Sequence, residues 1–474
     1  MDAWDQKPPA IAFLYSLFLK VWPGEAVVPA ADIAAAGVVA CLLVLLGRSR
    51  FSSHVGFGAA AVFLLAGDPY LQRMSGIFVR GQCEPFISLA IASSLVLIAY
   101  ARGRRLHLIG AGAALAMAVW LKYNAITYAL PVAIASCAWS PETDREPRSS
   151  LSALAFVALG FAIVSSVFFL YLTANGALHD WRLATIDYNI RYANETYDTP
   201  ASIVRYFLTF PIERARLDML WFLGGLGVLL LVPGVRLQRS TLVIFGWLLA
   251  AVLSIAINGS RSLPNYFVQA NPALALAASA GLATLAWRGT SIRVAMGALL
   301  LAALWRVGPD APAWGFRLAS LPGLVNNIRF DLRYLRGEIG RDAYLQRFSG
   351  RKHDADENEH LTRFIRAHSS PRDPVFVFGF SGGSVGWKSE RVSPSRFYWS
   401  HPILIEFAAE LPGYGSAGLL EDLRRRPPAI VVLQKEEWRS YDFFMSNKRL
   451  RHWLDEAYRL DHTTPMFAVY RRIH

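Results

Sequence analysis

Charged residues stand beside apolar segments at three separate points of the sequence, an arrangement suited to chemistry on an anionic substrate attached to lipid. Asp5 and Lys7 precede one apolar run, Glu84 precedes a second, and Lys122 interrupts a third. A lysine at the membrane centre costs about 2.5–3.5 kcal/mol, whereas at the boundary its charged end reaches water. We therefore expect Lys122 at a membrane boundary, level with Lys7 and Glu84.

Each of these groups also has a purely structural explanation. Asp5 and Lys7 could be the snorkelling charges of an interfacial amphipathic helix. Glu84 could complement the dipole of the helix that follows it. Arg261, in a short loop between two apolar runs, could bind a phosphate bidentately or balance the acids of the bundle.

A longer polar stretch contains "DWRLATIDYNIRYANETYDTP", where aromatic and amide groups alternate with arginine. Such groups suit the binding of sugars and phosphates, and they equally suit a membrane-interface belt. The sequence shows no glycine-rich phosphate loop, no metal-ligand pair of histidines and no nucleophilic triad. Cys41, Cys83 and Cys137 make no metal spacing and are expected to be small core residues.

The composition predicts an all-α polytopic membrane bundle. The 474 residues are 54% hydrophobic and only 18% charged, and the mean hydropathy is +0.31. The apolar residues come in blocks of membrane-spanning type rather than in amphipathic stripes. About ten candidate spans are predicted, at 26–46, 54–67, 84–101, 106–120, 123–139, 151–174, 218–234, 241–257, 267–287 and 292–306.

The net charge of +13 does not indicate a nucleic-acid partner, because many of the arginines lie in alternate short loops between spans. The positive-inside rule makes those loops cytoplasmic. The segments expected on the outer face are then Met1, 68–83, 121–123, 175–217, 258–266 and everything after about 307.

The last part of the chain is predicted to be an extracytoplasmic α/β domain. "PVFVFGF", "AIVVLQ" and "TPMFAVYRRI" are typical of strands, and "NEHLTRFIRAH", "GLLEDLRRRPP" and "NKRLRHWLDEAYRL" of helices. Leu361, Phe364 and Ile365 share one face of the first of these helices. The predicted organisation is an outer-loop segment with an interfacial helix at 1–25, a transmembrane domain at 26–306, a linker at 307–330 and the α/β domain at 331–474.

Taken in order, these motifs resemble those of polytopic GT-C glycosyltransferases. Within that class, they are most similar to the motifs of the bacterial branch that is related to protein O-mannosyltransferases and lipid A aminoarabinose transferases. Asn265 departs from the pattern, since histidine is frequent there in the family. The resemblance rests on "WDQKPPAIAFLYSLFLKVWPG", "EPFISL", "LAMAVWLKYNAITYALP", "ATIDYNIRYA", "RSLPNYFVQANPALAL", "DPVFVFG", "SPSRFYW" and "RRPPAIVV".

The resemblance implies transfer of a hexose or pentose, with inversion, from a polyprenyl-phosphate donor to an envelope lipid, polysaccharide or protein. Such a protein must deprotonate an acceptor and neutralise a departing phosphate. Asp5 and Glu84 would be catalytic. The donor phosphate would contact Lys7, Lys122 and Arg261, and the substrate loops would hold Asn189, Tyr192 and Tyr266.

The same resemblance implies a multi-pass protein of the bacterial inner membrane that transfers sugar on the outer face. It leaves the cofactor open, with a divalent cation as the candidate, and assigns no metal ligand. It also implies that a first span and an acidic outer-loop motif are missing before Met1, since Asp2 and Asp5 align only with the later part of that loop. We expect either a mis-set start codon or a degenerate gene.

Two other classes of protein remain open on the sequence. A transporter or flippase of lipid-linked sugars would be indicated by inverted repeats, which the sequence does not show. An inactive membrane scaffold, whose outer domain binds a partner, is favoured by the missing first span.

Overall fold

The computed structural model describes residues 5–24, 27–67, 82–139, 147–232, 239–261, 263–285, 329–346, 355–435 and 439–473. The chain divides into two compact units, Gln6–Arg329 and Phe330–His474, the latter together with Met1–Asp5. The first unit is helical and the second holds a small sheet, which confirms the predicted mixture of elements. The predicted span 292–306 and most of the predicted linker 307–330 lie outside the described residues.

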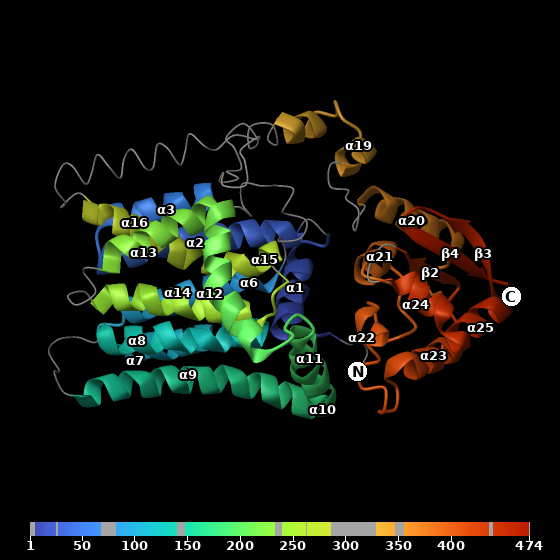
Figure 1. Ribbon diagram of the computed structural model, residues 1–474, viewed down its shortest axis with the longest axis horizontal. Coiled ribbons are helices and arrows are strands. Elements are labelled where there is room, and N and C mark those ends of the chain that lie inside the picture. Colours follow the sequence, from blue (N-terminus) through green and yellow to red (C-terminus); the bar gives the residue numbers. More distant parts are fainter. Residues whose placement is uncertain are drawn as a thin grey trace. The chain divides into compact units, whose positions relative to one another are not determined.

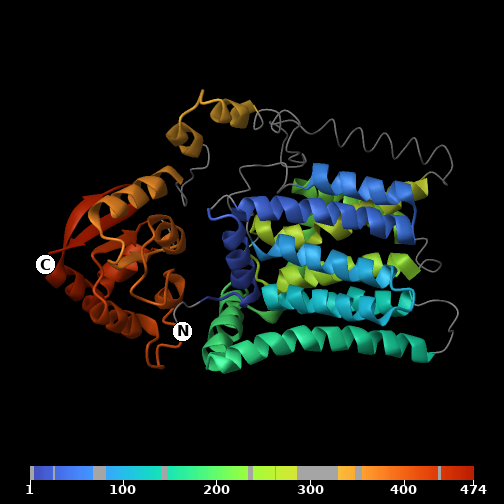
Figure 2. The same ribbon diagram turned by 180° about the vertical axis from the view of Figure 1, so that it is seen from behind.

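Most long helices of the Gln6–Arg329 unit run side by side, while α12 crosses them and α1, α10 and α11 lie across one end (Figures 1 and 2). The elements are α1 (Ala10–Val21), α2 (Val27–Arg50), α3 (Ser53–Ala66), α6 (Cys83–Ala99), α7 (Arg105–Leu121), η1 (Tyr123–Tyr128), α8 (Ala129–Ala138), α9 (Pro147–Ala174), α10 (Leu178–Arg182), η2 (Leu183–Asp187), α11 (Tyr188–Asn194), α12 (Pro200–Leu217), α13 (Met219–Leu231), α14 (Arg239–Ile257), α15 (Pro264–Phe267), η4 (Val268–Ala270) and α16 (Asn271–Leu285).

Three described helical segments are long and apolar enough to cross a membrane, namely α2, Ser150–Ala174 of α9, and α14. Six shorter apolar helices accompany them among the described residues. The total of about ten spans stays a prediction. The segment 175–217, predicted only as an outer loop, contains α10, η2, α11 and α12.

Glycine allows several of these helices to pack with their backbones in contact. A Cβ atom at Gly112 of α7 would lie 1.8 Å from the Val157 carbonyl oxygen of α9, and one at Gly160 would lie 1.9 Å from the Ile109 oxygen. Gly227 of α13 meets Ala277 of α16 in the same way, at 2.2 Å. Small residues drive helix association in membranes because lipid supplies no hydrophobic force between helices.

The ends of α6 and α7 place two charged residues at the same end of the bundle. Gln82 is extended and α6 begins directly after it, so Glu84 lies in the first helical turn. Arg102 and Gly103 have positive φ in the turn that reverses the chain into α7. Because α6 and α7 have 17 residues each, the hairpin returns the chain to its starting level, and Lys122 follows the last residue of α7 in an extended conformation.

The C-terminal unit contains a four-stranded sheet in the order β1-β2-β4-β3. Strands β1 and β2 are parallel, and the other two pairs are antiparallel. Its elements are α19 (Arg341–Gln346), α20 (Ala355–His368), β1 (Val375–Phe378), α21 (Gly382–Ser389), α22 (His401–Leu404), α23 (Gly415–Arg425), β2 (Ile430–Gln434), α24 (Ser440–Ser446), α25 (Lys448–Ala457), β3 (Tyr458–Thr463) and β4 (Phe467–Arg472).

The predicted helices and strands of this unit are confirmed except at one point. Leu361 and Ile365 of α20 are buried in its core, and Phe364 packs against them. The prediction of helix through Leu460 was wrong, because α25 ends at Ala457 and Tyr458–Thr463 forms β3. β3 is the edge strand of the sheet and pairs with β4 as a hairpin, across the short connection 464–466.

The glycine contacts yield a prediction for stability. Gly227→Ala should destabilise the helical unit by about 1–3 kcal/mol, because its Cβ would overlap the backbone of α16. Gly225→Ala is the matched control, since a Cβ there meets nothing within 4 Å on the same helix. Thermal unfolding in detergent should show a lower midpoint for Gly227→Ala only. Equal midpoints for the two variants would contradict the packing described.

Candidate active site

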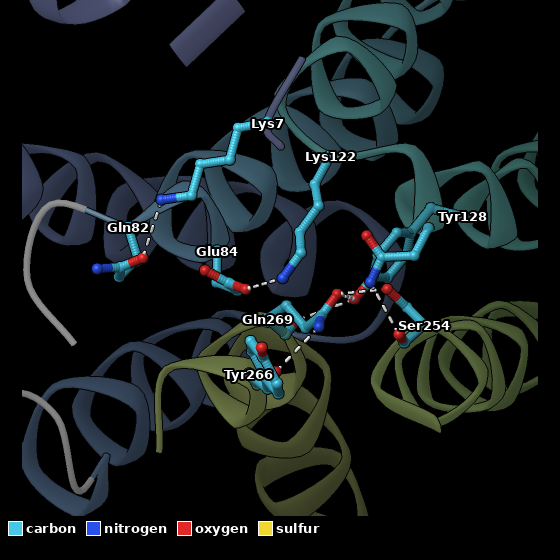
Figure 3. Close-up of polar contacts among 9 residues, drawn as sticks. Lys7, Gln82, Glu84, Lys122, Tyr128, Ser254, Tyr266 and Gln269 are labelled. Atoms are coloured by element: carbon cyan, nitrogen blue, oxygen red, sulfur yellow. Dashed lines mark hydrogen bonds and ion pairs between the residues drawn. The ribbon is translucent and has the colours of Figure 1, made fainter. Parts of the chain in front are cut away.

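A buried ion pair forms the centre of the candidate site. The ammonium nitrogen of Lys122 lies 2.7 Å from Oε1 of Glu84 (Figure 3). The Glu84 side chain is 1% exposed and that of Lys122 is 18% exposed. The Lys122 nitrogen also lies 4.3 Å from the ring centroid of Tyr266, where the ring face attracts the cation. The structure therefore brings together two residues predicted separately from two apolar runs.

Lys7 lies next to this pair through Gln82. Its ammonium group donates a hydrogen bond of 3.3 Å to Oε1 of Gln82, two residues before Glu84 in the chain. Figure 3 shows Lys7 and Lys122 approaching the Glu84 region from two different segments. Two cations and one carboxylate thus gather at this end of the helical unit.

Asn189 anchors the segment that carries Lys7. Its amide nitrogen donates to the backbone oxygen of Gln6 at 2.6 Å and to that of Thr185 at 2.8 Å. Thr185 belongs to η2, a short π-helix directly before α11. Such wide turns are frequent at functional sites, because they leave carbonyl groups free for other partners.

A polar network inside the bundle fixes the backbone of Tyr266. Oε1 of Gln269 accepts hydrogen bonds from Ser254 at 2.7 Å and from the hydroxyl of Tyr128 at 3.1 Å. Its amide nitrogen donates to the Tyr266 carbonyl at 2.9 Å. Gln269 is 1% exposed, so all three bonds are needed to offset the cost of burying the amide. The network holds the Tyr266 ring beside Lys122.

Arg261 is engaged within the protein. Its guanidinium group donates to the Tyr192 carbonyl at 3.1 Å, pairs with Glu195 at 3.0 Å, and lies 3.8 Å from the centroid of the Tyr192 ring. These contacts join the α14–α15 connection to the end of α11. They match the predicted alternative in which Arg261 balances the acids of the bundle. A phosphate that binds Arg261 would have to compete with Glu195 for the guanidinium group.

Two tyrosines outside the apolar spans stay protonated at neutral pH. Burial raises the pKa of Tyr266 to about 12, Glu84 adds to the effect, and Arg261 and Lys7 oppose it. Burial likewise raises the pKa of Tyr192 to about 12, with opposition from Arg261 and Lys122. The three predicted phosphate-binding residues, Lys7, Lys122 and Arg261, therefore each lower the pKa of at least one of these two tyrosines. Both hydroxyl groups can serve as hydrogen-bond donors.

Asp5 belongs to the other compact unit. It packs with Phe330–His474, where the hydroxyl of Tyr398 forms a hydrogen bond with its carboxylate. Burial raises the pKa of Tyr398, and the interaction with Asp5 adds to this effect. The catalytic role of Asp5 stays a prediction.

Among the described residues, one group could hold a metal ion. Side-chain ligand atoms of Asp342, Asp356 and His360 lie within 4.8 Å of one another in the C-terminal unit. The sequence analysis gave His360 no role. His360 already pairs with Asp356, and Arg363 already pairs with Asp342. Exposed acids with such partners are common without a metal, so the candidate divalent cation gains no support here.

Sequence reasoning missed the residues that support the charged ones, chiefly Gln82, Tyr128, Ser254 and Gln269. A signal existed for Gln269, which interrupts the apolar run "YFVQANPALAL". Polar groups inside membrane segments are rare and usually have a role. For Gln82, only its place two residues before Glu84 could have pointed to it.

Comparisons with known proteins address the family and the fold of the chain. Residues 6–169, which hold Lys7, Glu84 and Lys122, match the family of dolichyl-phosphate-mannose-protein mannosyltransferases. The crystal structure of ArnT from Cupriavidus metallidurans bound to undecaprenyl phosphate has a TM-score of 0.60 at 15% identity, covering 98% of this chain and 88% of that one. ArnT in the apo state gives 0.57 at 14% identity with the same coverage.

The Archaeoglobus fulgidus oligosaccharyltransferase in complex with zinc and sulfate has a TM-score of 0.49 at 13% identity, covering 98% of this chain and 65% of that one. No curated protein matches the sequence significantly. The family match over residues 6–169 and the fold shared with ArnT confirm the predicted resemblance to GT-C glycosyltransferases. The chain is a membrane protein with the fold of ArnT.

The ion pair predicts a non-additive effect on stability. Glu84→Gln should destabilise the protein by about 3–5 kcal/mol, because it removes the counter-charge of the partly buried ammonium group of Lys122. Lys122→Met should act similarly by isolating Glu84. The double variant should recover most of the loss, since no charge remains unpaired. Thermal unfolding in detergent measures all three, and additive losses in the double variant would show that the two charges do not interact.

Proposed function

We propose that this protein is a glycosyltransferase that moves a sugar from a polyprenyl-phosphate donor to an acceptor in the cell envelope. The observation that carries the proposal is the Glu84–Lys122 pair with Lys7 beside it, at one end of an ArnT-like helical unit. ArnT has been crystallised with undecaprenyl phosphate. A lipid-linked phosphate requires cations at the membrane boundary and apolar helices around its chain.

The chemistry needs a cation for the departing phosphate and a base for the acceptor. The acceptor oxygen forms a bond to the anomeric carbon as the bond from that carbon to the phosphate oxygen breaks, and the electron pair stays with the phosphate. Lys7 and Lys122 would neutralise the growing negative charge. Arg261 would add long-range positive potential while it remains paired with Glu195.

The ion pair also suggests how Glu84 becomes a base. In the structure, the Glu84 carboxylate lies 2.7 Å from the ammonium group of Lys122. A donor phosphate that binds Lys122 would compete with Glu84 for that ammonium group. Glu84, released from the contact, could then take the proton of the acceptor hydroxyl.

The reaction would take place on the outer face of the bacterial inner membrane, with the predicted α/β domain on that side. Asn189 would position Lys7 through Gln6, and the hydroxyl groups of Tyr192 and Tyr266 would donate to the donor or the acceptor. Asp5 would be the second catalytic acid.

A transfer assay with a radiolabelled polyprenyl-phosphate sugar and an envelope extract as acceptor tests the proposal. Glu84→Ala and Lys7→Ala should each lower the rate by at least about 100-fold, because one removes the proposed base and the other a cation on the leaving phosphate. Lys20→Ala is the matched control, since Lys20 is exposed on α1, the helix that follows Lys7. Its rate should equal that of the wild type.

Two outcomes would overturn the proposal. Movement of the labelled lipid across a vesicle membrane without transfer would indicate a flippase. Neither transfer nor translocation by folded wild-type protein, with every donor and acceptor pool supplied, would indicate a scaffold.

A further inference from the structure

The C-terminal unit has a feature that the proposed transferase does not use, a glycine-rich turn between β1 and α21. The turn, Gly379–Gly383, follows the carboxyl end of β1, and Gln434 ends the parallel neighbour β2. In open α/β sheets, ligands bind outside the carboxyl ends of parallel strands.

The register of β1 and β2 explains why glycine is required in this turn. Phe378 pairs with Leu433, so Gln434 stands opposite Gly379. A Cβ atom at Gly379 would lie 2.4 Å from the Cβ and Oε1 atoms of Gln434. Without a side chain at 379, the Gln434 amide lies against the turn, and its Oε1 accepts a hydrogen bond of 3.0 Å from the backbone nitrogen of Ser381.

Two buried polar groups at this turn have no hydrogen-bond partner among the described residues. They are the Ser381 hydroxyl and the amide nitrogen of Gln434. Ser381 is 2% exposed and Gln434 is fully buried. Oε1 of Gln434 already accepts a hydrogen bond from the Ser381 nitrogen, which fixes the orientation of the Gln434 amide. The NH₂ group of that amide is then left as a donor beside the turn. Buried groups left unpaired are rare in native proteins and call for a ligand or water.

The backbone of α21 adds donors at the same place. Ser381 precedes α21, and its side chain makes no capping hydrogen bond. The first intrahelical bond runs from the nitrogen of Val385 to the Ser381 oxygen. The N–H groups of Gly382, Gly383 and Ser384 therefore have no acceptor within the helix. Gly383 and Ser384 are exposed, so the turn is open to solvent on that side.

All these groups can donate, which defines the ligand. A helix N-terminus with an amide NH₂ and a hydroxyl suits a group that only accepts hydrogen bonds and carries negative charge. We infer that the Gly379–Gly383 turn, with Ser381 and Gln434, is a binding site for a phosphate group, either inorganic phosphate or the phosphomonoester of a lipid headgroup. This inference is independent of the proposed glycosyl transfer.

Calorimetric titration of the full-length protein in detergent with inorganic phosphate, at constant ionic strength, tests the site. Ser381→Ala should weaken phosphate binding by about tenfold, because a hydrogen bond to a charged group is lost. Gln434→Glu keeps an oxygen for the Ser381 nitrogen but replaces the NH₂ donor by a carboxylate oxygen, and it should abolish binding. Ser389→Ala, at the other end of α21, is the control and should bind as the wild type does.

A second arm separates the two sources of phosphate. Vesicles of phosphatidic acid in phosphatidylcholine should compete with inorganic phosphate if a lipid headgroup is the ligand, and they should not compete if only free phosphate fits. Either result supports the site, provided that Ser381→Ala reduces the binding.

Three results would overturn the proposed phosphate site. They are no saturable phosphate binding by the wild type, a phosphate affinity of Ser381→Ala equal to that of the wild type, and phosphate binding that is lost in Lys7→Ala but kept in Ser381→Ala. The last would place the phosphate at the transferase site. Ser381→Ala should fold normally, since its hydroxyl makes no hydrogen bond to lose. Phosphate should therefore raise the unfolding temperature of the wild type more than that of this variant, even if Gln434→Glu proves unstable.

Discussion

The helical unit depends on one electrostatic constraint, a buried carboxylate paired with a partly buried ammonium group at the end of an apolar bundle. Neither Glu84 nor Lys122 could be buried alone without a cost of several kcal/mol. Their 2.7 Å contact requires the first turn of α6 and the end of α7 to lie at the same level, which the equal lengths of the two helices provide. The pair also gives Tyr266 and Lys7 a charged centre to pack around.

Several segments near this pair have irregular backbone, and side chains form hydrogen bonds with the backbone groups there. The 3₁₀ segments η1 and η4 and the π-helix η2 supply Tyr128, Gln269 and Thr185 to the contacts described. In a membrane, non-helical backbone is tolerated only where protein or a polar cavity replaces the missing hydrogen bonds. Thr127, for example, donates to the carbonyl of Ala250 in the facing helix.

Much of this arrangement could be predicted from the sequence, because charge in an apolar context is a strong signal. Lys122 was expected at a boundary from the cost of burying it, and Glu84 from its place at the start of an apolar run. The supporting residues were not found, because a lone Gln269 or Tyr128 reveals its partner only after the helices have packed. β3 was missed for a different reason: Tyr458–Thr463 follows α25 directly and was read as the end of that helix, whereas it forms a hairpin with β4.

The central claim is that the Glu84–Lys122 pair, with Lys7, receives the phosphate of a lipid-linked donor. The most direct measurement is an experimental structure of the protein in complex with undecaprenyl phosphate. The account predicts phosphate density within hydrogen-bond distance of the Lys7 and Lys122 nitrogens, with Lys122 moved away from Glu84. Phosphate bound elsewhere, with the 2.7 Å ion pair intact, would contradict it.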